Sequence, residues 1–137
     1  MKKITIFLLT VLFLLSLSSC YLFYSDSTPP CLDFQDSTVK IEISDKSGVS
    51  RTLIKSAEIE EILSVLKKAE PTRRESVNDT PAKDEYWVIR VIFAESTDTL
   101  YLYKSNRFFG IVSSWYVERP YSGIYEIREQ DAKSILD

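Results

Sequence analysis

One segment constrains the fold more than any other. Tyr86–Ala94 is rich in aromatic and β-branched residues and is apolar on both faces apart from Arg90. Such residues favour β-strands, and a strand that is apolar on both faces has to be covered on both. The segment therefore predicts a central strand of a sheet, covered by a helix.

A second strand pattern lies upstream, where Thr38–Ser44 alternates strictly between apolar and polar residues. A period of two indicates a half-buried strand. Asp45–Gly48 has the composition of a turn, so we expect Val49–Lys55 to return as the second strand of a hairpin.

The segment after this hairpin has the period of an amphipathic helix. Ser56 is suited to cap its N-terminus, and Pro71 prevents its continuation. One apolar stripe, spaced as in an α-helix, is formed by Ile59, Ile62, Leu63 and Leu66. We expect this stripe to pack on a sheet, because the opposite face is acidic and therefore unlike a membrane-binding helix.

The C-terminal part predicts further short strands. The expected strands are Thr99–Lys104, Arg107–Ser113 with a bulge at Gly110, an edge strand Trp115–Glu118, and Ile124–Ile127. A turn is expected at Ser105–Asn106, and a final helix at Asp131–Leu136. Short connections favour antiparallel pairing. The expected fold is α+β, a single antiparallel sheet of about five to six strands with one main helix on one face and a short C-terminal helix.

The N-terminus has the organisation of an export signal. Met1-Lys2-Lys3 is basic, residues 4–17 are apolar apart from Thr5, Thr10 and Ser16, and small residues precede Cys20. The apolar run is shorter than the roughly 20 residues that a membrane span needs. An uncleaved anchor with a chance cysteine is the alternative interpretation.

Leu17-Ser18-Ser19-Cys20 resembles the lipobox of bacterial lipoproteins. The resemblance implies a signal peptide over 1–19, cleavage before Cys20, and a diacylglyceryl group on the Cys20 thiol. It also implies localisation at the extracytoplasmic face of the cell membrane, with the lipid on Cys20 as the membrane contact. Two acyl chains anchor a protein stably where one does not.

Residues 20–37 are then expected to form the lipidated cysteine and a flexible tether, and residues 38–137 the extracytoplasmic α+β domain. Ser25–Pro30 is polar and contains two prolines, which disfavours helix and strand. Leu32 and Phe34 are apolar and are candidates to dock on the domain.

Composition excludes several classes of function. The net charge is −3 and no basic block is present, which disfavours nucleic-acid binding. The absence of histidine removes Ser-His and Cys-His catalysis and most zinc sites. Lipidation of Cys20 would leave Cys31 unpaired, either as an incidental residue or as a thiol for an intermolecular disulfide or other reaction.

Two further stretches, Pro71–Pro81 and Glu118–Ile127, are similar to an uncharacterised domain found in lipoproteins of low-GC Gram-positive bacteria. The similarity covers about Val39–Ile127. It supports export in a Gram-positive host and implies no activity.

A group of aromatic and basic residues near Pro120 is the candidate binding site: Trp115, Tyr116, Arg119, Tyr121 and Tyr125. Tyrosine and tryptophan combine a large apolar area with a polar group and are enriched at interfaces. The connection 70–85, which contains Arg73 and Arg74, could supply a polar rim. The alternative is that Trp115 and Tyr125 belong to the core and that Tyr121 packs on Pro120.

Motifs for catalysis are weak. Ser37-Thr38-Val39-Lys40 and Ser64-Val65-Leu66-Lys67 match the Ser-x-x-Lys pattern of penicillin-recognising enzymes, but the partner motifs are missing. Asp79, Asp84 and Glu85 share a loop without the spacing of a calcium site. We expect no metal and no cofactor.

The leading hypothesis is thus a non-catalytic binding or interaction module at the cell envelope, with an envelope protein or glycan as partner. A first alternative is a carboxylate-based hydrolase of envelope glycans that uses Glu118 and Glu126, which requires the two carboxylates to face each other across a cleft. A second is a structural or immunity-type lipoprotein without a ligand.

Overall fold

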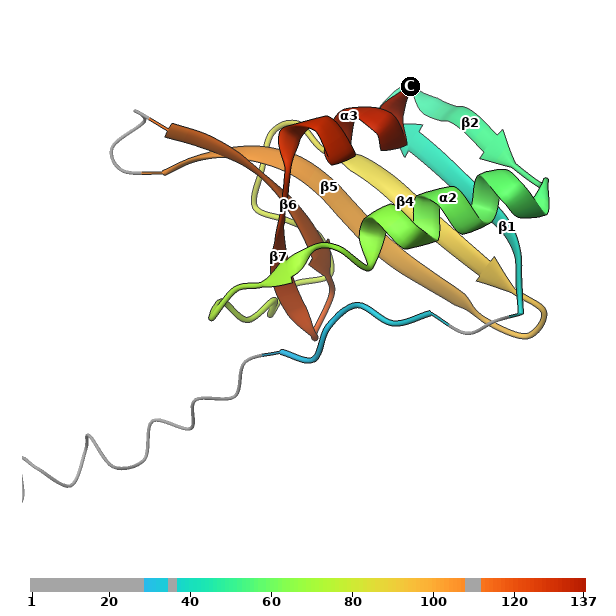
Figure 1. The fold of residues 1–137 in the computed structure, drawn as a ribbon. Helices are drawn as coiled ribbons and strands as arrows, with labels where there is room; N and C mark the ends of the chain where they lie inside the picture. The colour runs from blue at the N-terminus through green and yellow to red at the C-terminus, as the bar shows by residue number, and fades with distance from the viewer. Residues whose placement is uncertain (1–28, 35–36, 108–111) are drawn as a thin grey trace, which may run out of the picture.

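The computed structural model describes residues 29–34, 37–107 and 112–137 (Figure 1). The predicted signal peptide, Cys20 and Gly110 lie outside these residues. The elements are β1 (Thr38–Asp45), β2 (Gly48–Leu53), α2 (Ser56–Leu66), β3 (Glu70–Pro71), β4 (Trp87–Phe93), β5 (Thr97–Arg107), β6 (Val112–Arg119), β7 (Gly123–Ile127) and α3 (Glu129–Leu136).

The strands form one antiparallel sheet in the order β2-β1-β4-β5-β6-β7-β3. The predicted α+β class is confirmed. The sheet has seven strands in the described part of the chain, more than predicted, and one of them is the two-residue β3, which pairs with β7 and had no sequence signal. The hairpin β1–β2 and the internal position of β4 agree with the prediction.

The main hydrophobic core lies between one face of the sheet and the two helices, which both cover that face (Figure 1). Ile89 and Val91 of β4 are fully buried there, as the pattern of the central strand indicated. From the helices, the core receives Ile59, Ile62, Val65, Leu66, Ala132 and Ile135.

The opposite face of the sheet carries a second, aromatic cluster. Tyr101, Tyr103 and Tyr116 alternate along β5 and β6 with residues of the main core and are buried together with Ile124. The connection 72–86 covers this cluster. Three cationic side chains lie over aromatic rings on this face. Arg74 is 5.9 Å from the ring centre of Tyr116, Lys83 lies over the ring of Tyr103, and Lys46 lies over the ring of Tyr86.

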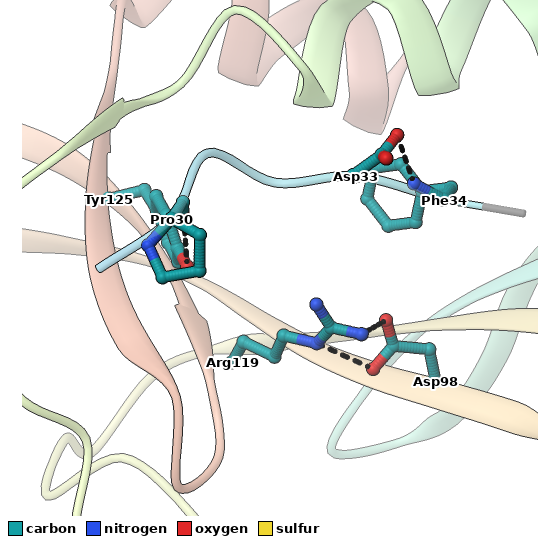
Figure 2. A network of polar contacts seen from close by, with 6 residues as sticks. All are labelled: Pro30, Asp33, Phe34, Asp98, Arg119 and Tyr125. Atoms are coloured by element: carbon teal, nitrogen blue, oxygen red, sulfur yellow. Dashed lines mark hydrogen bonds and ion pairs between the residues drawn. The ribbon is translucent and has the colours of Figure 1, made fainter.

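The residues 29–34, which we call the strap, cross the core side of the domain (Figure 1). Leu32 and Phe34 are only 2% and 6% exposed, so their expected docking is confirmed. The Tyr125 hydroxyl donates to the Pro30 carbonyl oxygen at 2.9 Å (Figure 2). The packed part of the chain therefore starts by residue 29, within the stretch that was expected to be a tether, because these apolar side chains close the core.

Local predictions are wrong in three places. Ser105 and Asn106 do not form a turn but lie within β5, paired with Ser114 and Ser113, because continued strand pairing satisfies their backbone groups. The single strand expected over Arg107–Ser113 is divided as a result, since Arg107 ends β5 and pairs with Val112 of β6. The strand through Trp115 is not an edge, since β7 pairs with its outer side.

The third wrong prediction is the cap of the main helix. Lys55 is the N-cap residue of α2 and no side chain caps it, whereas the Ser56 hydroxyl contacts Glu60. The final helix also begins slightly earlier than expected, at Glu129.

Candidate functional site

The five residues of the predicted aromatic site do not form one surface. Trp115 belongs to the main core and packs against Trp87, with ring centres 5.7 Å apart. Tyr125 is also in that core, where its hydroxyl meets the strap. Tyr116 is buried on the opposite face of the sheet against Tyr103. The alternative that placed Trp115 and Tyr125 in the core therefore describes these two residues correctly.

Arg119 is engaged by a carboxylate of the neighbouring strand. Its Nη2 lies 2.7 Å from Asp98 Oδ2 and its Nε 3.2 Å from Asp98 Oδ1 (Figure 2). The first of these contacts is an ion pair by distance but lacks hydrogen-bond geometry, so Oδ2 keeps no hydrogen-bond partner in the described structure. Arg119 therefore links β6 to β5 through the carboxylate of Asp98.

Tyr121 is the member of the set that points to solvent. It is 69% exposed and has a φ of 57°, in the left-handed region. The Ser122 N–H donates to the Arg119 carbonyl and closes the turn between β6 and β7. The Tyr121 hydroxyl donates to Asp79 Oδ1 at 2.6 Å, and this hydrogen bond raises the pKa of Tyr121.

A concavity beside Tyr121 joins three distant parts of the chain. It has a volume of about 510 Å³, and we call it the Tyr121 pocket. Its lining consists of Pro29, Pro30, Glu75, Ser76, Val77, Tyr121 and Ser122. The structure thus brings together Tyr121 and the connection 70–85, as expected, but Trp115 lies elsewhere. The contribution of the strap was missed, because nothing in Pro29-Pro30 distinguishes a wall from a linker.

Ser76, which lines this pocket, is held by other buried polar groups. The Ser76 hydroxyl donates to Glu118 Oε1 at 2.7 Å, with both residues buried. The Tyr103 hydroxyl donates a hydrogen bond to the same carboxylate. The pKa of Tyr103 is raised, mainly because the side chain is buried and secondly because Glu118 is close. The sequence analysis did not predict these contacts. The feature that could have located Glu118 is the alternation along β6, which puts Glu118 on the same face of the sheet as Tyr116.

Glu118 and Glu126 lie on adjacent strands and on the same face of the sheet. They are offset in register, since Glu118 pairs with Ile124 and Glu126 with Tyr116. Glu126 borders a separate surface hollow with Lys68, Glu70 and Arg128. The Tyr121 pocket, the hollow beside α2 and the hollow beside Glu126 are each lined without both carboxylates.

The two Ser-x-x-Lys matches lie at the surface. Lys40 Nζ is 2.7 Å from Glu42 Oε1, and Lys67 Nζ is 3.5 Å from Asp33 Oδ1. Each ammonium therefore has a carboxylate partner. Among the residues that the structure describes, no group of three or more His, Cys, Asp or Glu side chains is arranged to hold a metal ion.

Within the ranges 29–34, 37–107 and 112–137, no helix has the length and apolar character to cross a membrane. Cys31 is an exposed free cysteine of the strap.

The family model DUF5301, described as a domain of unknown function (DUF5300), matches residues 28–126. The chain belongs to this family. The matched range begins at the strap and so includes the residues that close the Tyr121 pocket. None of the curated proteins matches the chain.

One solved structure is similar to this chain over most of its length, an NMR structure of a protein from Ruminococcus gnavus. The two are 27% identical, with a TM-score of 0.60, over 75% of this chain and 98% of the other. The shared fold therefore includes nearly all of that protein.

Proposed function

We propose that the protein is a lipid-anchored, non-catalytic interaction module at the extracytoplasmic face of the cell membrane, and that it binds through the surface around Tyr121. One observation carries the binding role. A tyrosine occupies a left-handed backbone position, in which a residue with a side chain costs about 1–2 kcal/mol and glycine does not. Backbone strain of this kind is concentrated at functional positions.

The strained residue also displays its side chain. The ring of Tyr121 is exposed at the rim of the pocket, and the hydrogen bond to Asp79 fixes its hydroxyl. A fixed aromatic ring beside a concavity offers apolar contact area at a low cost in side-chain entropy. These features favour recognition of a partner over a purely structural turn.

The anchor is supported by the basic head, the apolar segment and the Leu-Ser-Ser-Cys sequence. Cys20→Ser tests it directly in cells fed radiolabelled palmitate. The native protein should be labelled and shortened by 19 residues, and the variant should be neither. Lipid label on the C20S protein would contradict the anchor.

The binding role is tested by photo-crosslinking from position 122, which borders the pocket. In whole cells, we expect a crosslinked species that disappears in Tyr121→Ala. The matched control is Ile54→Ala, since Ile54 is equally exposed but lies outside the pocket. A crosslinking pattern that is the same with and without the Tyr121 ring would argue against this surface.

A further inference from the structure

The Tyr121 pocket lies where the packed chain begins. Pro29 and Pro30 of the strap line it, and the chain continues from Pro29 towards Cys20. Pro29 lies nine positions after Cys20, and a chain of that length spans at most about 30 Å. If Cys20 carries the lipid proposed above, this end of the domain is held close to the membrane.

Two large apolar side chains are exposed at the same end. Val77 is 67% exposed and Tyr121 69%, and both line the Tyr121 pocket. They come from connections that are 44 positions apart in the chain, so only the fold brings them together. Tyrosine is enriched at the level of lipid headgroups, where its ring contacts apolar groups and its hydroxyl contacts water.

Charge around this surface is balanced. The exposed Arg73 and Arg74 are followed by Glu75, and Asp79 binds the Tyr121 hydroxyl. A surface that binds membranes through charge carries an excess of Lys and Arg. Contact with lipid would therefore depend on the apolar side chains, with little effect of salt or of anionic lipid.

We propose that Val77 and Tyr121 dock this domain on the lipid surface to which Cys20 anchors it. This inference rests on the proposed anchor and names the partner of the proposed binding surface. Two side chains bind a membrane too weakly for a free protein. The anchor makes the contact intramolecular, and a short linker gives effective concentrations in the millimolar range. Docking therefore requires the anchor and fixes the orientation of the domain.

The orientation is defined by the fold. The connection from β2 to α2, which contains the exposed Ile54, lies on the side of the domain opposite to β7 (Figure 1). In the docked state this connection faces away from the membrane. Ile54 therefore provides a control position with matched exposure.

The test uses the mature chain from Cys20, with Cys31→Ser so that Cys20 is the one thiol. Its thiol is coupled to a maleimide lipid in phosphatidylcholine vesicles, made with or without brominated acyl chains. Tyr121→Trp places a fluorescent ring at the site, and Ile54→Trp is the matched control. We expect bromine to quench the added emission of Tyr121→Trp and not that of Ile54→Trp.

Two comparisons sharpen the result. Adding Val77→Ser to Tyr121→Trp should reduce the quenching, and the same protein without lipid coupling should show none. Equal emission of Tyr121→Trp in both kinds of vesicle would overturn the proposal, as would quenching that is identical at position 54. In that case a protein captured by the crosslinker at position 122 would be the partner. Because chemical coupling replaces the native lipid, this result is independent of the C20S labelling test.

Discussion

Ser76 and Glu118 are 42 positions apart in the chain, yet the serine hydroxyl lies 2.7 Å from the carboxylate with both residues buried. This contact ties the connection 72–86 to the far face of the sheet. The Tyr103 hydroxyl donates a hydrogen bond to the same Glu118 carboxylate. One buried carboxylate thus binds both Ser76, which lines the Tyr121 pocket, and Tyr103 of β5.

Removal of either partner should loosen this connection. Glu118→Ala leaves two buried hydroxyls without their acceptor, and we expect a loss of about 1–3 kcal/mol in the free energy of unfolding. Ser76→Ala should cost about 1 kcal/mol. Urea denaturation measures both values, and hydrogen exchange should show faster opening of residues 72–86. Ser64→Ala, at an exposed position of α2, is the control and should change stability by less than about 0.5 kcal/mol.

The pKa of Tyr103 predicts a loss of stability at alkaline pH. Burial and the Glu118 carboxylate raise this pKa in the folded state above the ordinary value of 10.0. Above pH 10 the unfolded chain therefore loses a proton that the folded chain keeps, so the free energy of unfolding falls as pH rises further. Below that pH the contribution is fully present.

Tyr103→Phe checks this in urea titrations from pH 8 to about 11.5. The variant should be less stable at pH 8, because Glu118 loses a donor, but its decline above pH 10 should be shallower. A smaller slope should remain, since burial also raises the pKa of Tyr101. A decline as steep as that of the native protein would contradict the assignment.

The strap should be part of the folding unit. Leu32→Ala and Phe34→Ala remove buried side chains from the core and should cost about 2–5 kcal/mol each. Cys31→Ser, at the exposed position next to Leu32, should change the free energy of unfolding by less than about 0.5 kcal/mol. Thermal unfolding of the three variants decides the point. If Leu32→Ala unfolds at the same temperature as Cys31→Ser, the strap contributes nothing.

How far the sequence predicts this structure depends on how local each signal is. Alternation in β1, the helical stripe of α2 and the apolar character of β4 are local patterns, and each predicted its element. The turn expected at Ser105–Asn106 failed because pairing with β6 is a long-range interaction that outweighs turn propensity. Tyr121 was found for its chemistry, but its neighbours Pro29 and Val77 come from segments that only the fold brings together.

Replacement of Tyr121 should separate binding from stability. Tyr121→Gly relieves the left-handed strain of about 1–2 kcal/mol, but adds backbone freedom to the unfolded chain and removes the hydrogen bond to Asp79. The free energy of unfolding should therefore change little, while crosslinking at the pocket is lost. A large loss of stability in urea would mean that the ring is retained for packing and not for recognition.

Gly123 is required by the close approach of the strap. A Cβ at this position would lie 2.7 Å from Pro29 Cβ and 2.8 Å from Pro29 Cγ, too close for either atom. Gly123→Ala should push the strap away from β7 and cost about 1–3 kcal/mol. Pro29→Gly removes the atoms that clash, so the double variant should recover most of this loss. A double-mutant cycle in urea measures the coupling, and strictly additive effects would show that Gly123 and the strap do not meet.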